Sequence, residues 1–244
     1  MGRAANIEFS ISTWRQPMPP EPDDNRARVV DRVVRMIDAI GERRLRVAVD
    51  GFTAAGKTSF GHELARGLAR RGRPVGRASL DDFKRPWSEA HLYDRVSGPG
   101  YYRNAFDIAA IRRLLLDPLD PSGDGVVALC SIDPLTQIDH SASTTALAPN
   151  GVLVVDGVFA CRPGLDSCWD LRVWLEIAPE LSVRRGTERD AAMEGGAEAA
   201  AALHRERYLP SELLYLDEVD PRSFVEVIVD NTDFDAPRLV RPAN

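Results

Sequence analysis

The chain has 244 residues, of which 44% are hydrophobic and 28% are charged. This length and composition suit one α/β domain with a sizeable core, with or without a small appendage, and they exclude a predominantly disordered chain. The net charge of -6 provides no general attraction for nucleic acid or for an anionic membrane. We therefore expect neither of these as a partner, and a polyanionic ligand would need a local binding site.

The sequence also bears on the compartment of the protein. No apolar run approaches the roughly 20 residues of a membrane span, and the first residues lack the apolar core of a signal peptide. Cys130, Cys161 and Cys168 lack paired metal-ligand spacing and cannot all pair with one another, which suits a reducing compartment. The sequence therefore predicts a cytoplasmic protein in which the cysteines are packing residues.

Hydrophobic patterns predict alternating helices and strands. Residues 1–24 are expected to form an N-terminal extension, in which a strand-like run at 7–14 precedes a proline-rich linker. Apolar residues then recur at helical spacing over 24–40, and the main domain is expected over 25–244. Further strands are expected at 45–49, 75–80, 126–132 (a strand or hairpin arm), 151–155, 171–177 and 225–229, and further helices at 57–71, 107–116, 180–190 and 197–209. This alternation predicts a layered α/β sheet whose continuous apolar strands are covered on both faces.

Residues 51–58, with the sequence GFTAAGKT, carry the strongest motif of the chain. They fit the phosphate-binding loop G-x-x-x-x-G-K-[ST] at every fixed position, between a predicted strand and a predicted helix. Glycines let the backbone N–H groups curl around phosphate oxygens, and the following helix directs its positive end at the same point. Lys57 would bridge the β- and γ-phosphates, and Thr58 would hold Mg²⁺. The other predicted nucleotide contacts are Gly51, Thr53, Ala54, Ala55, Gly56 and Ser59.

Lysine is rare in this chain, which strengthens the motif. Only Lys57 and Lys84 are lysines among the 31 basic residues, and all the others are arginines. A compact ammonium group fits inside a phosphate loop where a guanidinium group does not. The choice of lysine at position 57 therefore supports a phosphate-binding role. Because lysine is so rare in this chain, Lys84 is also expected to have a specific local role.

A phosphate loop identifies a nucleotide site and leaves the reaction open. The N-K-x-D element of GTPases is absent, and Asp156 is followed by Gly157 where transport ATPases commonly carry a glutamate. A small-molecule kinase instead needs a carboxylate near the γ-phosphate to accept the proton of a hydroxyl group. Asp81 and Asp82 follow a predicted strand and suit this role, because the carboxyl ends of parallel strands share one edge. A helix N-cap or a solvated loop is the alternative for these two residues.

Four segments resemble the uridine kinase family of P-loop kinases, whose relatives act on pantothenate, ribulose phosphate and nicotinamide riboside. These segments are residues 49–58, 79–83, 155–158 and 184–190, and the likeness extends over residues 45–232. The resemblance implies an α/β, P-loop NTPase-type fold of three layers, with a mostly parallel central sheet and a helical lid at about 180–210. It also implies ATP and Mg²⁺ as cofactors, Asp81 as the catalytic base, and Thr58, Asp81 and Asp156 beside the metal ion.

Three arginines in the expected lid, Arg184, Arg185 and Arg189, are predicted to contact the phosphates. Arg185 and Arg189 are four residues apart and share one helical face. A guanidinium group can bind phosphate oxygens in a fork, and an arginine supplied to a transferring phosphoryl group can accelerate transfer by about 10³ to 10⁵. We therefore group Arg185 and Arg189 with Lys57 and Asp81 as catalytic residues and assign Arg184 to the nucleotide. A solvated charged helix is the alternative.

The acceptor site is expected around residues 82–84 and 101–103. In nucleoside-phosphorylating members of the family a tyrosine follows the Asp-x-Phe stretch, whereas this chain has Lys84 and Arg85 there. These two cations and Arg103 could meet an anionic acceptor or could be solvated, and both readings stay open. The tyrosines near this site can also be core residues. The predicted acceptor contacts are Asp82, Phe83, Lys84, Tyr101, Tyr102 and Arg103.

Together these features favour an ATP-dependent kinase that phosphorylates a hydroxyl group of a small molecule, uridine or nucleoside-like by the family resemblance. The alternatives are a vitamin or sugar phosphate acceptor, a nucleotide-binding regulator with a decayed acceptor site, and an ATPase. A homo-oligomer is compatible with the sequence. His91, His140 and His204 are expected at the surface, and the tryptophans are expected in the core, although Trp87 falls in the acceptor region.

Overall fold

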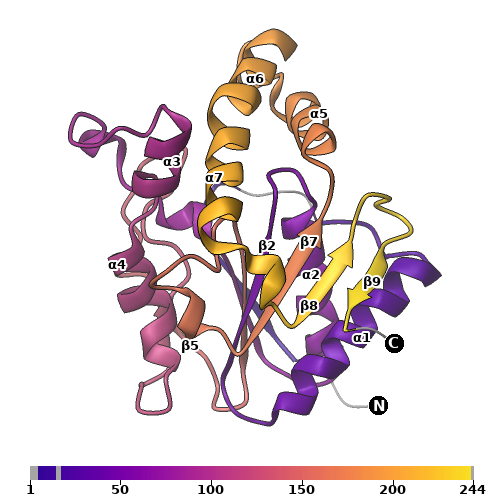
Figure 1. Cartoon of the computed structure of the whole chain (residues 1–244). Coiled ribbons are helices and arrows are strands. Elements are labelled where there is room, and N and C mark those ends of the chain that lie inside the picture. The colour runs from indigo at the N-terminus through magenta and orange to yellow at the C-terminus, as the bar shows by residue number, and fades with distance from the viewer. Residues whose placement is uncertain (1–4, 15–17, 243–244) are drawn as a thin grey trace.

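A computed structural model describes residues 5–14 and 18–242 of the chain, which build a central seven-stranded sheet (Figure 1). Its strands are β1 (Ile7–Phe9), β2 (Leu45–Gly51), β3 (Val75–Ser79), β6 (Val152–Asp156), β7 (Leu171–Glu176), β8 (Val227–Asp230) and β9 (Arg238–Arg241). Their order is β1-β3-β6-β2-β7-β8-β9, and every neighbouring pair is parallel except β8 and β9. The mostly parallel sheet predicted from the sequence is confirmed, whereas the short antiparallel strand β9 is not predicted.

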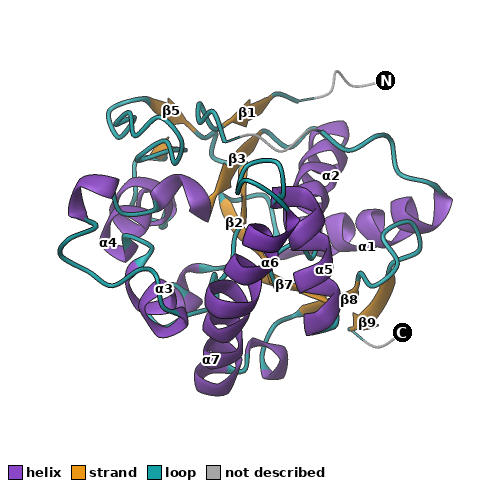
Figure 2. Cartoon of the chain, turned by 90° about the horizontal axis from the view of Figure 1, so that it is seen from above, coloured by secondary structure: helices purple, strands orange, loops and turns teal. Residues whose placement is uncertain are grey.

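Helices cover both faces of the sheet and form the outer layers (Figure 2). They are α1 (Asp24–Ile40), α2 (Lys57–Arg70), α3 (Gly98–Asn104), α4 (Ile108–Ala110), α5 (Pro179–Asp190), α6 (Ala197–Leu203) and α7 (Leu209–Val219). Helices α1 and α2 lie on one face, and α3, α4 and α7 lie on the other. A separate antiparallel hairpin consists of β4 (Val126–Ala128) and β5 (Thr144–Ala146). None of the helices within residues 5–14 and 18–242 has the length and apolar character that a membrane crossing requires.

Three central strands bring polar groups to one edge of the sheet. All five residues of β6 are buried, as a strand covered by helices on both faces requires. Asp156 at the end of β6 pairs in register with Val49 of β2 on one side and with Ser79 of β3 on the other. The loop after β2 and the turn after β3 therefore both begin next to Asp156.

The N-terminal segment differs from the sequence prediction. Residues 1–24 are predicted as an extension outside the domain, but β1 pairs in parallel with β3 and forms the edge of the central sheet. The physical reason is that β3 would otherwise present unpaired backbone groups at this edge. Ser10 then donates to Asp82 at 2.6 Å, and Thr13 donates to Asp133 at 2.9 Å. These bonds anchor the segment close to the polar edge of the sheet.

The helical segment after α5 also differs from the prediction. The sequence predicts a helix that ends before Pro210, whereas α6 continues through a π-helical stretch, His204–Tyr208, into α7. Pro210 lies in the first turn of α7. Because a π-helical turn changes the spacing of the hydrogen bonds, the proline ring and its missing N–H group are accommodated without ending the helix.

Candidate active site

The phosphate loop lies between the end of β2 and the start of α2. Gly56, the residue before α2, has a left-handed backbone with a φ angle of 91°. A Cβ atom here would lie 2.7 Å from Nδ2 of Asn231, so this position requires glycine. The first N–H groups of a helix lack partners within the helix, and the positive end of the helix dipole adds to them. The loop therefore presents N–H donors to a phosphate group at the start of α2.

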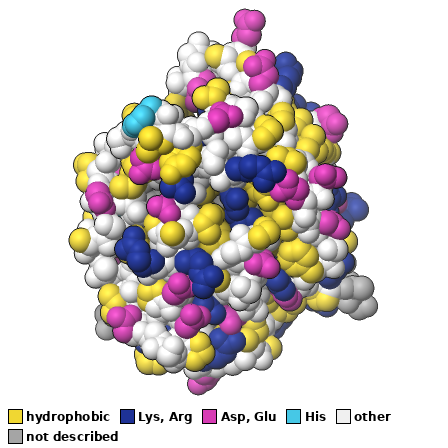
Figure 3. Space-filling view, turned by 60° about the vertical axis from the view of Figure 1, so that its left-hand side comes forward, with side chains coloured by type: hydrophobic (Ala, Val, Ile, Leu, Met, Phe, Trp, Pro, Cys, Tyr) yellow, Lys and Arg dark blue, Asp and Glu magenta, His cyan; other side chains and the backbone are white. Residues whose placement is uncertain are grey.

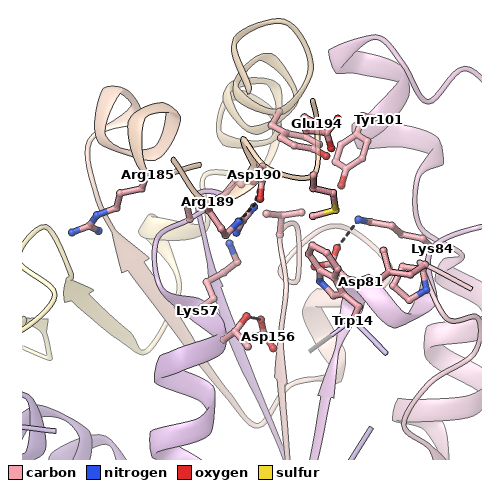
Figure 4. Close-up of a pocket in the computed structure, with 18 of the residues that line it drawn as sticks. Trp14, Lys57, Asp81, Lys84, Tyr101, Asp156, Arg185, Arg189, Asp190 and Glu194 are labelled. Atoms are coloured by element: carbon pink, nitrogen blue, oxygen red, sulfur yellow. Dashed lines mark hydrogen bonds and ion pairs between the residues drawn. The ribbon is translucent and has the colours of Figure 1, made fainter. Parts of the chain in front are cut away.

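Lys57, the first residue of α2, is folded back over the loop. Its Nζ atom donates to the carbonyl oxygens of Gly51 at 3.0 Å and Phe52 at 2.7 Å, and the side chain is buried. Burial lowers the pKa of Lys57, while the carboxylates of Glu212 and Asp50 oppose this shift. Figure 4 shows that the ammonium group points into the pocket. It is therefore available to a phosphate group that enters there.

Asp156 and Thr58 supply oxygen atoms suited to a magnesium ion. The Thr58 hydroxyl donates to Oδ2 of Asp156 at 2.6 Å, and Nη2 of Arg77, a buried residue of β3, donates to Oδ1 at 2.5 Å. Mg²⁺ prefers oxygen ligands and commonly combines one or two protein groups with phosphates and water. Thr58 and Asp156 fit this pattern. Residues 5–14 and 18–242 contain no group of three or more His, Cys, Asp or Glu side chains that could hold a metal ion.

Asp81 lies in the short 3-10 turn Leu80–Phe83 that follows β3. Its Oδ1 atom forms an ion pair with Nζ of Lys84 at 2.8 Å, and its side chain is 30% exposed. Burial alone would raise the pKa of Asp81, but Lys84, Lys57 and Arg189 together bring it below its usual value. The carboxylate is therefore ionised at neutral pH and can accept a hydrogen bond from a hydroxyl group.

One cavity of about 510 Å³ connects these groups (Figure 4). Its nucleotide end includes Lys57, Thr58, Ser59 and Asp156. The other end, which we call the acceptor end after the residues predicted for the acceptor, includes Trp14, Asp81, Lys84 and Tyr101. Trp87 and Tyr208 lie with Lys84 and Tyr101, since all four also line a neighbouring groove, and Gln137 accepts a hydrogen bond from the backbone N of Trp87 at 2.7 Å. The lid adds Arg189 and Asp190 to the same lining. The structure thus brings Asp81, Asp156 and most of the predicted phosphate-loop residues to one space, whereas Gly51 and Ala55 of the loop lie outside the lining.

Arg189 is held in place by two buried side chains of the lid. Its Nε and Nη2 atoms donate to the two carboxylate oxygens of Asp190 at 2.6 and 2.9 Å. Nε2 of His204 lies 2.8 Å from Oδ2 of Asp190, and His204 is 1% exposed. Burial would raise the pKa of Asp190, but Arg189 and His204 bring it well below its usual value. Asp190 is therefore a carboxylate that fixes the direction of the Arg189 guanidinium group.

The burial of His204 contradicts the expectation of a surface histidine. Helix α6 packs on α5, and the imidazole ring lies over Gly186, where a Cβ atom would be only 2.1 Å from Cε1 of the ring. Tyr208 packs edge-on against the same ring, with the ring centroids 5.1 Å apart. The expectation fails because it considers metal-ligand spacing and not the packing of the two lid helices.

Arg185 and Arg184 are placed differently from Arg189. Arg185 lines the cavity, but its guanidinium group donates to the carbonyl oxygens of Asn231 at 3.2 Å and Thr232 at 2.8 Å. In Figure 4 it points away from the centre of the cavity. Arg184 is exposed and is not among the residues that line the cavity. The lid therefore presents Arg189, and not all three arginines, to the centre.

The predicted acceptor residues divide into two groups. Lys84 and Tyr101 line the cavity. The other four lie outside its lining: Asp82, Phe83, Tyr102 and Arg103. Tyr102 packs among aromatic residues of the core, and Arg103 forms an ion pair with Glu218 at 2.6 Å. Successive residues of a helix point in different directions, so three consecutive residues of α3 cannot all face one cavity.

Three residues that the sequence does not single out also reach the site. Trp14 lines the cavity from the N-terminal segment, and Arg77 holds Asp156. Glu212 of α7 accepts hydrogen bonds from the backbone N of Thr53 at 2.5 Å and from its hydroxyl at 2.6 Å. Burial raises the pKa of Glu212 to about 7, against the opposing effect of Lys57. An arginine inside an apolar strand was an available signal for Arg77, whereas the other two carry no local signal.

Comparison with known proteins identifies the fold. No family model matches the chain. A possible uridine kinase from Bacillus stearothermophilus has 22% identity and a TM-score of 0.63, over 82% of this chain and 96% of that chain. A candidate fructose transport system kinase from Silicibacter sp. TM1040 has 20% identity and a TM-score of 0.65, over 80% and 94% of the two chains. The chain has a P-loop kinase fold.

A third structure shares the P-loop kinase fold at greater distance. D-glycerate 3-kinase from Cryptococcus neoformans var. grubii serotype A has 14% identity and a TM-score of 0.54, over 86% of this chain and 99% of that chain. In open sheets of this kind, ligands bind outside the carboxyl ends of the strands. The cavity described above lies at that edge of this P-loop kinase fold, where β2, β3 and β6 end.

Proposed function

We propose that the protein is an ATP-dependent kinase that transfers the γ-phosphoryl group of ATP to a hydroxyl group of a small molecule. The observation that carries this proposal is the composition of one cavity. It contains the phosphate-loop Lys57 and the oxygen pair of Thr58 and Asp156. It also contains Asp81, a separate carboxylate that nucleotide binding alone does not need. An acceptor hydroxyl group needs such a carboxylate to take up its proton.

In the proposed reaction the start of α2 and Lys57 bind the β- and γ-phosphates of ATP. Lys57 exchanges its bonds with the loop carbonyl groups for bonds with phosphate oxygens, which favour its charged form despite burial. Thr58 and Asp156 would hold a magnesium ion, and such an ion would neutralise part of the phosphate charge. Arg77 fixes the Asp156 carboxylate beside Thr58.

Phosphoryl transfer then uses Asp81 and Arg189. The acceptor oxygen attacks the γ-phosphorus in line with the leaving oxygen of ADP. A bond forms between the acceptor oxygen and the γ-phosphorus. The bond from the γ-phosphorus to the β,γ-bridging oxygen breaks, and its electron pair stays on ADP. Asp81 accepts the proton of the hydroxyl group, and Arg189 stabilises the charge on the transferring group.

The names of the structural neighbours support transfer to a small molecule. They refer to kinases of uridine, of a fructose transport system and of D-glycerate. The sequence resemblance to the uridine kinase family supports a nucleoside-like acceptor. Lys84 stands where nucleoside-phosphorylating members have a tyrosine, and this difference supports a vitamin or sugar phosphate acceptor instead.

A nucleotide-binding regulator is the second candidate. The ion pair between Asp81 and Lys84 favours it, because a carboxylate already paired with an ammonium group must be released before it can accept a proton. Such a protein would bind Mg-ATP without transferring phosphate.

Incubation of the protein with Mg-ATP and a panel of nucleosides, vitamins, sugars and sugar phosphates separates the candidates. A kinase releases ADP only with its acceptor and forms a phosphorylated product. Binding of Mg-ATP without turnover on any panel member would favour the regulator, and ADP release independent of acceptor would indicate an ATPase. Lys57→Ala shows whether turnover comes from this site, since it should reduce both turnover and the affinity for ATP.

A further inference from the structure

A second groove of about 510 Å³ opens beside the acceptor end of the cavity, and the reaction proposed above does not use it. The two spaces adjoin, because four residues line both: Lys84, Trp87, Tyr101 and Tyr208. The rest of the groove comes from residues 90–96 and from Arg85, Ala105 and Arg207. Figure 3 views this side of the molecule and shows basic side chains gathered next to hydrophobic ones.

The groove is positively charged, although the chain has a net charge of -6. Four cationic side chains line it: Lys84, Arg85, Arg95 and Arg207. Among the described residues that line it, Asp94 is the one carboxylate. Asp94 accepts hydrogen bonds from the backbone N of Val96 at 2.9 Å and of Ser97 at 3.1 Å, and from the Ser97 hydroxyl. These bonds engage Asp94 with the start of α3 and leave the excess of positive charge in place.

Two of the arginines are oriented by neutral partners. Arg95 donates to the carbonyl oxygens of Arg85 at 2.6 Å and Pro86 at 3.2 Å. Arg207 donates to the carbonyl oxygen of Val96 at 3.0 Å. A carbonyl oxygen fixes the direction of a guanidinium group without neutralising it, and a guanidinium group has five N–H donors in all. Both side chains therefore keep charge and donors for a ligand.

The third arginine, Arg85, packs on the ring of Tyr93, with the guanidinium carbon 4.7 Å from the ring centroid. Its Nη1 atom forms a long ion pair with Glu89, at 3.6 Å, and Glu89 does not line the groove. The Nε atom of Arg85 is buried without a hydrogen-bond partner among the described residues. An unsatisfied buried donor of this kind costs free energy. Arg85 therefore has hydrogen-bonding capacity that the described residues do not use.

We propose that this groove binds an anionic group of the acceptor, a phosphate or a carboxylate, while the acceptor hydroxyl group lies at Asp81. The inference rests on the proposed kinase function and narrows its acceptor to an anionic molecule. Planar guanidinium groups bind both kinds of oxyanion through paired N–H donors. Lys84, at the junction of the two spaces, contacts the bound anion and releases Asp81 from its ion pair, so that Asp81 can accept the hydroxyl proton.

The test compares acceptors that differ in the anionic group. Suitable pairs are glycerol and D-glycerate, panthenol and pantothenate, ribose and ribose 5-phosphate, and fructose and fructose 6-phosphate. With Mg-ATP at saturation, at least one charged member should be phosphorylated with a kcat/KM about tenfold or more above that of its neutral counterpart. Calorimetry with a non-hydrolysable ATP analogue measures the binding of each member separately from turnover.

Arg95→Gln and Arg207→Gln remove the charge and keep an N–H donor for the backbone carbonyl groups. Each should raise the KM and the dissociation constant for the charged acceptor about tenfold or more and leave the KM for ATP unchanged. Arg205→Ala is the matched control, because Arg205 is exposed, lies two residues before Arg207 and lines neither space. Thermal unfolding shows that each variant is folded.

Equal use of the neutral and charged members would overturn the inference and leave the kinase function standing. The same holds if Arg205→Ala raises the KM as much as Arg207→Gln does, or if neither glutamine variant changes the binding of a charged acceptor. Failure of every charged member to bind or react would also overturn it. In that case the wider acceptor panel decides on the proposed function, which falls only if no acceptor there promotes ADP release.

Discussion

The nucleotide end of the cavity is held by short hydrogen bonds between buried or half-buried groups, whereas the acceptor end is lined by side chains from loops and helices distant in the sequence. Lys57 reaches a loop carbonyl oxygen at 2.7 Å, and Thr58 reaches Asp156 at 2.6 Å. At the acceptor end, Trp87 is 61% exposed and Trp14 comes from the N-terminal segment. The first end is therefore in place before a ligand binds, and the second depends on how separate segments pack.

This difference between the two ends predicts two kinds of substitution effect. Changes in the groups that act on the transferring phosphoryl group should reduce turnover, and changes in the wall of the acceptor end should reduce mainly the affinity for the acceptor. A variant of one group that shows the effect expected of the other group would contradict the comparison.

Asp81→Asn is expected to have the largest effect. It keeps the size of the side chain but removes the base, so turnover should fall by about 10² to 10⁴. ATP binding should persist, because the Asp81 carboxylate pairs with Lys84 at 2.8 Å and not with the phosphate loop. Steady-state assays with the acceptor found by the panel, and calorimetric titration with Mg-ATP, measure the two quantities.

The pH profile of the wild-type protein gives an independent check on Asp81. Because its pKa lies below the usual value, protonation of Asp81 should not reduce kcat/KM as the pH falls from neutrality toward about 5. Asp81→Asn should then show its loss at every pH in this range. If it turned over at the wild-type rate, another group would have to accept the proton.

Disturbing the pair of Asp190 and His204 should reduce turnover less. Asp190→Asn and His204→Ala release the guanidinium group of Arg189 from its fixed direction without removing it. Since a misplacement of about 1 Å can cost about 10²-fold in rate, we expect kcat to fall by about 10- to 100-fold. The KM for the acceptor should change little. Single-turnover and steady-state kinetics separate these parameters.

Two comparisons distinguish positioning of Arg189 from a general loss of structure. His204→Gln retains an N–H donor for Asp190 and should recover part of the activity, and Arg205→Ala, on the exposed side of the same turn, should lose none. In an Arg189→Ala background, Asp190→Asn should have almost no further effect on kcat, since the two residues act as a unit. Additive losses would mean that Asp190 acts by another route.

The nucleotide end could be predicted from the sequence because its parts are local. The phosphate loop is contiguous, and Asp156 follows a strand that the alternation of elements identifies. Asp81, at the acceptor end, could be predicted for the same reason, because it also follows such a strand. Parallel order alone then brings the carboxyl ends of these strands to one edge. In the structure, Asp156 pairs with Val49 and with Ser79, so the ends of β2, β3 and β6 lie side by side.

The sequence predicts Arg189, Lys84 and Tyr101, which line the cavity, but most other contacts of the lid and the acceptor end could not be predicted in this way, because they join distant segments. Thr53 and Glu212 are 159 positions apart, and Thr13 and Asp133 are 120 positions apart. Such contacts arise only when whole elements pack, as α6 does on α5 around His204. Strand β1 joins the sheet for the same reason, since the sequence of the N-terminal segment does not reveal the exposed edge of β3.

Trp14→Ala tests the acceptor end and should have a smaller effect. Trp14 lines the cavity, and loss of an aromatic contact worth about 0.5–1.5 kcal/mol should raise the KM for the acceptor about two- to tenfold, with kcat nearly unchanged. Ile11→Ala is the control within the same segment, since Ile11 is 51% exposed. A fall in kcat without a change in KM would break the division between the two ends.

The last prediction concerns Glu212, which links α7 to the phosphate loop through Thr53. Burial raises the pKa of Glu212 from 4.5 to about 7, although Lys57 and His204 oppose the shift. A carboxyl group whose pKa rises on folding binds its proton more tightly in the native state. The stability that this proton contributes is therefore present below about pH 4.5 and is lost as the pH rises to about 7.

Glu212→Gln keeps an acceptor for Thr53 and removes the charge, so its free energy of unfolding at pH 8 should exceed that of the wild type by roughly 1–3 kcal/mol. This corresponds to several degrees in Tm for a chain of this size. The difference should shrink toward pH 5, and a weaker slope should remain in the variant because burial also raises the pKa of Asp82 to about 7. Glu198→Gln, at an exposed position of α6, should follow the wild type at every pH. Thermal melts from pH 5 to 8 measure these differences. If Glu212→Gln tracked Glu198→Gln throughout, the Glu212 carboxylate would carry no cost of burial, and the contact between α7 and the phosphate loop would open freely in solution.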